Sequence, residues 1–386
     1  MRVLKLIVKN VFRHKLRTTL TVLGMAIAVM AFGLIQAMVA SWNSGVASSE
    51  VDRLVTRDAV TIINPLPYAY LDKIKQVTGV KEVTYMNWFG GTYIDKKNFF
   101  ARMAVDENTL FQVYPEYILP PDQMADFKKE GNACVIGNAL AKQYNLKLGD
   151  IMTIEGDIYP GTWEFVVRGI YQPKLKSTDA TQMFFHWNYL NEKMKQDFPA
   201  RGDLVGWFIE RVDNAADANA VSTKIDDMFK NSPYETKTET ERAFQQSFVS
   251  ASSAIITGMQ YMSFVIIGII MLVLGNTMIM SARERTREYA VLKALGFSAK
   301  HLVGLIMGES IFISAIGGAL GVFLTFGAVN GMSESVPRSF FPVLEVLPSN
   351  LILALAAVML VGIVASIFPI NRALTTRISD GFRFAG

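Results

Sequence analysis

The chain has 386 residues, of which 51% are hydrophobic and 19% are charged, and its formal net charge is +4. The charged fraction lies below the ~25% that is usual for soluble domains. A single cysteine, Cys134, excludes an internal disulfide. The positive charge is carried by short segments beside long apolar blocks, so it does not indicate a nucleic-acid partner.

Residues 1–17 predict an amphipathic basic helix that lies on the inner face of a membrane. Five apolar residues recur at helical spacing, and basic residues take the other side: Leu4, Ile7, Val8, Val11 and Phe12, against Lys5, Lys9, Arg13 and Arg17. An ordinary positive flank without a defined helix is the alternative.

Four apolar blocks predict four transmembrane helices, since about 20 apolar residues are needed to cross a bilayer. The spans are expected at 18–42, within 243–282, at 301–330 and at 346–371. Buried helices of a soluble protein are disfavoured by these long charge-free runs. A cleaved signal peptide is disfavoured at the first block, whose uncharged run is too long. The first and second blocks exceed the bilayer thickness, so their outer parts, with Trp42 as an interfacial anchor, predict a helical stalk.

The distribution of Lys and Arg predicts the orientation. Basic residues gather in 1–17, in 283–300 and in the tail 372–386, whereas the short loop 331–345 holds only Arg338. By the positive-inside rule both termini face the cytoplasm, and residues 43–242 form a large external domain. The expected location is therefore the bacterial inner membrane, with a periplasmic or other extracytoplasmic domain.

The external domain predicts a mixed α+β fold, so the fold class is a four-span helical membrane protein carrying an α+β domain on a stalk. Residues 59–64, 80–89, 204–212 and 234–238 are expected as strands, with helices at 68–77 and 215–229. This pattern indicates a split βαβ unit over 58–109 and 204–240. Residues 110–203 form an insertion with strands and a helix of its own.

Catalytic and metal-binding patterns are missing from the sequence. No G-x-x-x-x-G-K-[ST] motif is present, and the three histidines do not cluster with other metal ligands. A Cys134–His186 dyad is arithmetically possible, but the apolar strand around Cys134 favours an inert buried thiol. The adjacent acids Asp106–Glu107 and Asp226–Asp227 are expected on solvated surfaces. We expect a non-catalytic chain that binds neither a cofactor nor a metal.

Residues 283–299, between the second and third spans, predict a short charged helix on the cytoplasmic side. Tyr289, Leu292 and Leu295 fall at helical spacing, and Gly296 suits the residue that follows a helix C-terminus. The chain offers no obvious cover for this apolar face, so lipid or the groove of a partner protein is expected there.

The segment RERTREYAVLKALGFS resembles the cytoplasmic loop of MacB/FtsX-type ABC transporter permeases, with Glu288, Leu292, Lys293, Ala294, Leu295 and Gly296 on the family pattern. The third span, the external sequence VIGNALAKQYNLKLGDIMTI and the first span are also similar to this family. The resemblance implies a coupling helix that docks on a separate ATPase subunit. Its site residues are Arg283, Arg287, Glu288, Tyr289, Leu292, Lys293, Leu295 and Gly296.

Polar and small residues inside the spans form a second set of candidates. Glu309 is costly in a membrane unless it is paired or protonated. It either pins the coupling helix to the third span through a nearby Arg or Lys, or bonds to the backbone, Thr277 or Asn276. Gly317 and Gly321 predict close helix packing.

The expected function is the membrane subunit of an ATP-driven transporter of the MacB/FtsX type. The resemblance implies two ATPase subunits that hold ATP and Mg, and a homodimer or a pair with a paralogous permease. A periplasmic adaptor is a further possible partner. Few polar residues lie in the spans, so we expect mechanotransmission to the external domain, for efflux or extraction of a hydrophobic, lipid, lipoprotein or peptide substrate. The alternative is an FtsX-like signalling scaffold that controls an extracytoplasmic enzyme.

Overall fold

The structure is a computed structural model that describes residues 2–96, 98–175, 178–251, 253–335 and 346–375. It divides into two compact units, each described below by itself. The first comprises residues 1–40, 253–335 and 344–386, and the second 41–252 and 336–343. Arg338, most of the predicted loop 331–345 and the tail beyond residue 375 lie outside the described residues, as do the side chains of Leu4, Lys5 and Trp42.

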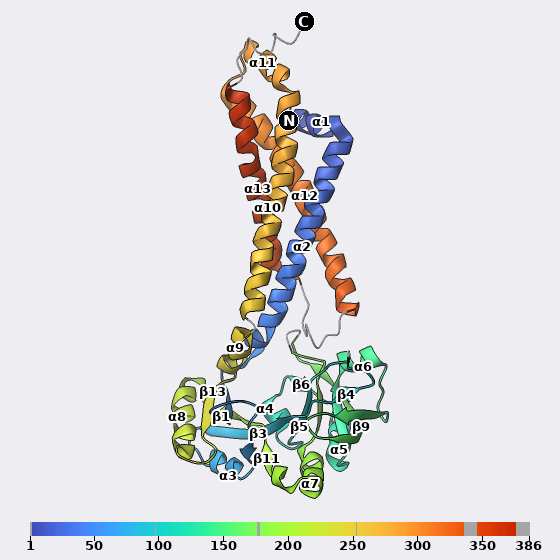
Figure 1. Cartoon of the computed structure of the whole chain (residues 1–386), viewed down its shortest axis with the longest axis vertical. Coiled ribbons are helices and arrows are strands. Elements are labelled where there is room, and N and C mark those ends of the chain that lie inside the picture. The colour runs from blue at the N-terminus through green and yellow to red at the C-terminus, as the bar shows by residue number, and fades with distance from the viewer. Residues whose placement is uncertain (1, 97, 176–177, 252, 336–345, 376–386) are drawn as a thin grey trace. The chain divides into compact units, whose positions relative to one another are not determined.

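The first unit is a helical bundle (Figure 1). Its helices are α1 (Arg2–Val11), α2 (Lys15–Ser48), α10 (Ser253–Glu284), α11 (Thr286–Ala294), α12 (Ala299–Ser335) and α13 (Pro348–Thr375), with a 3₁₀ turn η1 (Phe12–His14) between α1 and α2. Four of them, α2, α10, α12 and α13, are long and apolar enough to cross a membrane. The prediction of four transmembrane helices is therefore confirmed.

The amphipathic N-terminal helix is present, but part of its apolar face is covered by protein. Ile7 and Val11 are buried, and Ile7 packs where Gly308 of α12 leaves room. A Cβ atom at Gly308 would lie 2.6 Å from Ile7 Cδ1. Phe12 remains 46% exposed. The helix thus docks on α12, which covers part of its apolar face, and its place on the inner face of a membrane stays a prediction.

Gly317 and Gly321 lie where α12 meets α2. A Cβ atom at Gly321 would lie 2.5 Å from Val29 Cβ and 2.8 Å from the Ala26 carbonyl oxygen, and one at Gly317 would lie 2.9 Å from Met25 Cβ. Only glycine permits this approach, in keeping with small-residue packing between membrane helices.

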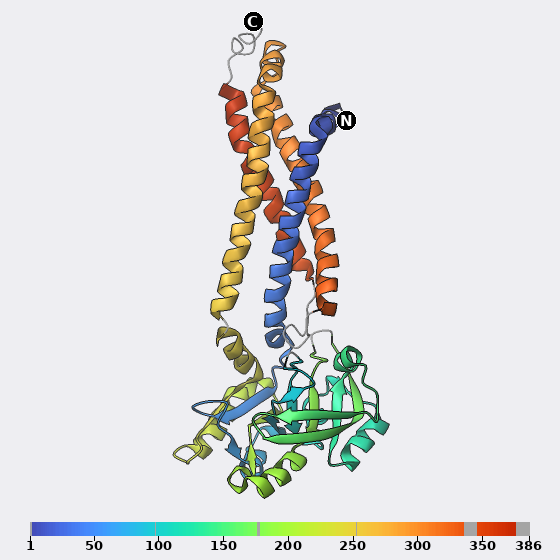
Figure 2. The ribbon, with the colours of Figure 1, turned by 45° about the vertical axis from the view of Figure 1, so that its right-hand side comes forward.

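The second unit is built on one 11-stranded sheet (Figure 2). The strand order is β13-β1-β12-β3-β5-β10-β7-β9-β8-β4, with β6 paired to β9. The strands are β1 (Arg53–Asp58), β3 (Val80–Trp88), β4 (Thr92–Tyr93), β5 (Arg102–Val105), β6 (Tyr117–Ile118), β7 (Ala133–Gly137), β8 (Ile151–Gly156), β9 (Gly161–Pro173), β10 (Met183–His186), β12 (Trp207–Val212) and β13 (Thr236–Thr240). A separate two-stranded sheet pairs β2 (Leu66–Pro67) with β11 (Leu204–Val205).

Helices cover both faces of the large sheet, because successive strand residues point to opposite sides. One core contains residues of α3 (Tyr70–Lys75), α6 (Asn138–Tyr144), α7 (Trp187–Asp197) and α8 (Ala218–Phe229). The other contains residues of α4 (Leu110–Val113), α5 (Pro121–Lys129) and α9 (Glu241–Ala251). The short 3₁₀ turns η2 (Pro199–Arg201) and η3 (Ala215–Asp217) flank α7 and α8.

The predicted split βαβ unit is present as β1-α3-β3 and β12-α8-β13, but three details differ. The first strand is 53–58, and residues 59–64 form turns, because the Asp58 carboxylate accepts hydrogen bonds from the Val60 and Thr61 amides and ends the strand. The predicted strand 204–212 is split at Gly206, whose amide donates to the Met86 carbonyl. The insertion is also not separate, since β5 pairs with both β3 and β10 and continues the sheet.

One acid sits in the sheet without a partner. Glu210 of β12 is fully buried, and neither of its carboxylate oxygens has a hydrogen bond among the described residues. Loss of hydration on burial raises the pKa of Glu210 to about 8. The Glu210 side chain is therefore neutral at pH 7.

Cys134 and His186 do not form a dyad. Cys134 is buried in β7, where loss of hydration raises the pKa of its thiol. The His186 ring bonds through Nε2 to the Phe127 carbonyl at 2.7 Å, and its Nδ1 lies 3.5 Å from a Glu107 carboxylate oxygen. Among the described residues there is no group of three or more potential metal ligands.

Candidate functional site

The predicted coupling helix is found as α11, a short helix held at both ends. At its start Arg285 departs from helical geometry, yet the Arg285 and Tyr289 amides still donate to the Ser281 and Arg285 carbonyls. At its end Gly296 has φ +88°, and the amides of Gly296 and Phe297 donate to the carbonyls of Lys293 and Leu292. This is the double hydrogen bond of a Schellman motif, which requires a left-handed residue. The chain therefore turns at fixed points on either side of α11.

A buried ion pair anchors the start of α11 to α12. Arg285 Nη1 lies 2.5 Å from Glu309 Oε1, and the two side chains are 5% and 4% exposed. Arg285 Nη2 also donates to the Asn10 carbonyl of α1 at 2.9 Å. One guanidinium thus joins α1, α11 and α12 at one end of the bundle.

Two further ion pairs connect this region to the N-terminal segment. Arg17 makes a bidentate pair with Glu284, with N–O distances of 2.6 and 2.8 Å. Arg13 pairs with Glu288 of α11. These pairs are more exposed than Arg285–Glu309, so water screens them and each contributes little to stability.

The faces of α11 differ from the prediction. Tyr289 is 3% exposed and Leu292 packs beside it on the bundle core, so these residues do not form an open apolar face with Leu295. The outward apolar surface, called the α11 outer face below, is instead Val291, Leu295 and Phe297, which are 41%, 70% and 48% exposed.

The remaining predicted residues of this loop are the basic residues Arg283, Arg287 and Lys293. Arg283 and Arg287 are exposed. Lys293 Nζ donates to the Leu374 carbonyl of α13 at 2.9 Å. Two basic side chains of the predicted set are therefore exposed, and the third bonds to α13.

Glu309 takes the first of its two predicted partners, a basic residue near the helix. Thr277 bonds to Thr21 of α2 instead, with 3.1 Å between the hydroxyl oxygens, and Asn276 points outward. Sequence reasoning named Arg283 and Arg287 and missed Arg285, because periodicity within a run of alternating charges does not single out the buried one.

A second charged centre lies in the sheet unit. Arg53, at the start of β1, is 1% exposed, and its Nε lies 2.8 Å from Glu241 at the start of α9. Its Nη2 lies 2.7 Å from Glu116, and the guanidinium stacks over Tyr114, 4.3 Å from the ring centroid. Arg53 thus ties the segment after α2 to the segment before α10 and to the insertion. No pattern in the sequence singles out Arg53, because it stands at the start of a strand with a charged sequence.

Comparison with known families matches most of the chain. The MacB-like periplasmic core domain matches residues 18–228, and the FtsX-like permease C-terminal domain matches residues 261–378.

Among individual proteins, the chain is 24% identical over 344 residues to "Uncharacterized ABC transporter permease MJ1507" of Methanocaldococcus jannaschii, covering 82% of this chain and 80% of that protein. It is 30% identical over 109 residues to "Uncharacterized ABC transporter permease YvrN" of Bacillus subtilis, covering 28% and 26%. It is 36% identical over 101 residues to "Macrolide export ATP-binding/permease protein MacB" of Brucella abortus, covering 25% and 14%. The chain therefore spans only about a quarter and a seventh of the last two proteins.

Two solved structures are also similar in part. The periplasmic region of MacB from Actinobacillus actinomycetemcomitans gives a TM-score of 0.39 at 12% identity, over 53% of this chain and 95% of that one. The extracellular domain of the transporter YknZ from Gram-positive bacteria gives 0.36 at 13% identity, over 49% and 98%.

Proposed function

The chain belongs to the family of ABC transporter permeases that join a MacB-like periplasmic core domain to an FtsX-like permease domain, and from this premise we propose that it couples a separate ATPase to its α+β domain. Two copies of the ATPase hold ATP and Mg, and this chain is the non-catalytic membrane subunit. The permease works as a homodimer or beside a paralogue. The termini and α11 face the cytoplasm of a bacterial inner membrane, and the α+β domain is periplasmic or otherwise external.

The observation that carries this proposal is the contrast between the two sides of α11. One side is fixed to α1 and α12 through the buried Arg285–Glu309 pair, and the other presents Val291, Leu295 and Phe297 to the outside. An apolar outer face suits the groove of a partner protein. A force applied there passes into α10 and α12 because the helix termini on both sides are closed by hydrogen bonds.

The work of the complex is proposed to occur outside the membrane. Helix α9 ends at Ala251 and α10 begins at Ser253, and α2 runs without interruption from Lys15 to Ser48. Along the chain, α2 and α9 therefore connect the spans to β1 and to the buried cluster around Arg53. The proposed outcome is efflux or extraction of a hydrophobic, lipid, lipoprotein or peptide substrate, with an adaptor as a further partner.

Co-purification of the tagged full chain with its ATPase subunit tests the α11 outer face. Leu295→Asp places a charge at the most exposed residue of the α11 outer face, and we expect the ATPase to be lost from the purified complex. The matched control is Leu148→Asp, a leucine that is 49% exposed in the sheet unit, and this variant should retain the ATPase. Retention of the ATPase by Leu295→Asp, with unchanged ATP turnover, contradicts the docking assignment.

A signalling scaffold that controls an extracytoplasmic enzyme is the second candidate, since it would use the same connection from α11 through the membrane helices to the α+β domain. The two functions differ in what ATP turnover changes. A transporter moves a substrate when reconstituted with its ATPase in vesicles, whereas a signalling scaffold hydrolyses ATP and moves none.

A further inference from the structure

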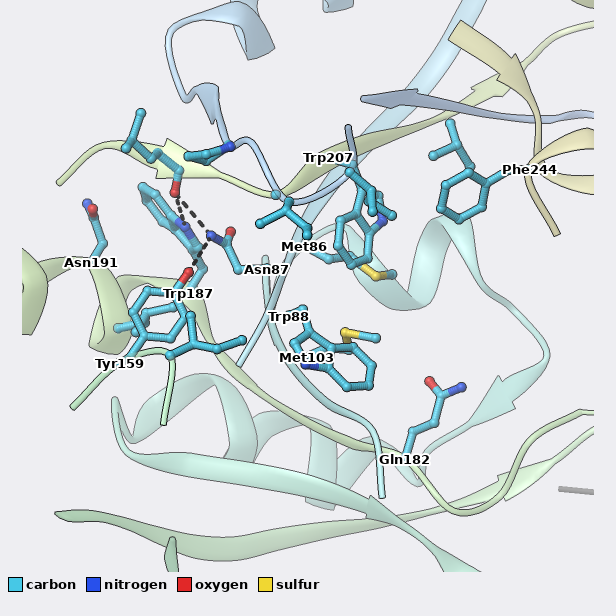
Figure 3. Close-up of a pocket in the computed structure, with 18 of the residues that line it drawn as sticks. Met86, Asn87, Trp88, Met103, Tyr159, Gln182, Trp187, Asn191, Trp207 and Phe244 are labelled. Carbon is cyan, nitrogen blue, oxygen red and sulfur yellow. Dashed lines mark hydrogen bonds between the residues drawn. The ribbon is translucent and has the colours of Figure 1, made fainter. Parts of the chain in front are cut away.

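The sheet unit contains a cavity of about 740 Å³ that the proposed coupling does not use (Figure 3). Two cross-strand pairs line it: Trp88 of β3 faces Met103 of β5, and Met86 of β3 faces Trp207 of β12. Trp187 of α7 contributes a third indole. A volume of this size lies within the range of about 300–1,000 Å³ that is typical of small-molecule sites.

The lining is aromatic, rich in sulfur and almost free of available charge. Its charged residues are Glu241 and Arg201. The Glu241 carboxylate is occupied by Arg53, and Arg201 is exposed and donates to the Ile158 carbonyl at 3.0 Å. An ionic ligand would lose its hydration, and among the described lining residues only the exposed Arg201 guanidinium has no carboxylate partner and could pair with it. Indole faces and thioether sulfurs instead favour flat, polarisable rings.

Several polar groups of the cavity are used to shape its wall, although Asn87 Oδ1 is buried without a hydrogen bond among the described residues. The Asn87 amide donates to the Tyr159 hydroxyl and the Leu204 carbonyl, both at 3.3 Å, and the Trp187 indole donates to the same carbonyl at 3.2 Å (Figure 3). These bonds hold Trp187 and Tyr159 in place and leave the apolar surfaces open to a ligand. At the rim, Ile63 is 85% exposed and Ile158 is 46% exposed, so the apolar surface continues outward.

We propose that this cavity binds an uncharged, flat, aromatic molecule of drug size. One wall is α9, which contributes Glu241, Phe244 and Gln245 and is the helix that precedes α10. A displacement of α9 therefore changes the cavity. The link between occupancy and ATP turnover rests on the proposed function, whereas binding itself does not.

The test uses the full chain in lipid nanodiscs and the neutral fluorophore N-phenyl-1-naphthylamine. Energy transfer from tryptophan to the probe is measured during titration, with empty nanodiscs as the blank for partition into lipid. We expect a saturable signal, which 1-benzylnaphthalene, a neutral ring compound, abolishes by competition. A strictly linear signal at all probe concentrations overturns the proposal, and so does displacement by dodecanol at lower concentrations than by 1-benzylnaphthalene.

A matched pair of variants locates the site. Met103→Trp fills the cavity, whereas Met228→Trp adds the same side chain at a position that is 45% exposed and does not line the cavity. We expect at least fivefold weaker binding for the first variant and unchanged binding for the second. Equal affinity of the two variants for the probe overturns the assignment of the site. If Met103→Trp does not fold, the competition with 1-benzylnaphthalene and dodecanol tests the proposal instead. Because these assays need no ATPase, their failure leaves the docking proposal standing, and loss of that proposal leaves the binding result intact.

Discussion

Replacement of Glu309 by Gln tests whether the buried ion pair transmits force or only holds the fold. The substitution keeps the shape of the side chain and removes the charge that lies 2.5 Å from Arg285 Nη1. Arg285 is then left buried without a counter-charge, which costs about 3–5 kcal/mol. We expect a lower unfolding temperature of the purified chain and weaker stimulation of the partner ATPase.

A double variant separates these two effects. When both members of a buried pair are replaced by apolar residues of similar volume, folding stability is often restored. Arg285→Met with Glu309→Leu should therefore unfold near the wild-type temperature but still fail to stimulate the ATPase. Glu284→Gln is the control, because its pair with Arg17 is more exposed, with Glu284 40% exposed, and its loss costs less than about 1 kcal/mol.

Thermal loss of the helical circular-dichroism signal, which reports the bundle, and ATP turnover of the reconstituted complex give the two readouts. Recovery of ATP turnover together with stability in the double variant refutes a transmitting role, because the charges would then serve folding alone. An unchanged unfolding temperature in Glu309→Gln refutes the buried pair itself.

Three further predictions concern the rest of the chain. Glu210 has a folded-state pKa of about 8 against an ordinary 4.5, so the free energy of unfolding falls as pH rises from about 4.5 to 8. Glu210→Gln should remove this pH dependence. Relative to the wild type, the free energy of unfolding from melting curves should rise by about 5 kcal/mol above pH 8 and be unchanged at pH 4. Glu82→Gln, at a half-buried position of β3, is the control and should keep the wild-type pH profile. Gly321→Leu should lower the yield of folded chain in size-exclusion chromatography because its Cβ meets Val29, whereas Gly327→Leu, with open space around it, should not. Arg53→Met leaves Glu241 buried without its partner, so the free energy of unfolding of the sheet unit should fall by about 3–5 kcal/mol and its unfolding temperature should drop. An unchanged melting curve contradicts the buried network.

The bundle was accessible from the sequence because membrane helices must carry long uncharged runs, and such runs leave few alternatives. The glycine pair of the third span was accessible for the same reason, since spacing alone places Gly317 and Gly321 on one face. The partner of Glu309 was predicted only as a class of residue. Arg285, and not a neighbouring arginine, points into the bundle because its backbone departs from helical geometry between α10 and α11. No local sequence pattern predicts that departure.

The sheet unit shows a different limit. The alternation of apolar and polar residues predicted most strands. It did not predict that β5 joins the insertion to the split βαβ unit, because the sequence of one strand does not determine which distant strand it pairs with. The first strand was misplaced because apolar residues 59–64 outweighed the charged sequence of β1. Arg53 is tolerated inside that strand only because Glu241 and Glu116 compensate it, and both lie far along the chain.

The position of Arg53 limits how the length of this protein can vary. Four residues separate Ser48, the end of α2, from Arg53, and successive strand positions point to opposite sides of the sheet. Insertion or deletion of a single residue within β1 would turn the guanidinium away from its two carboxylates and present it to the opposite core. Natural relatives should therefore keep β1 free of gaps and accommodate length changes in loops remote from it, such as the turns around residues 157–160.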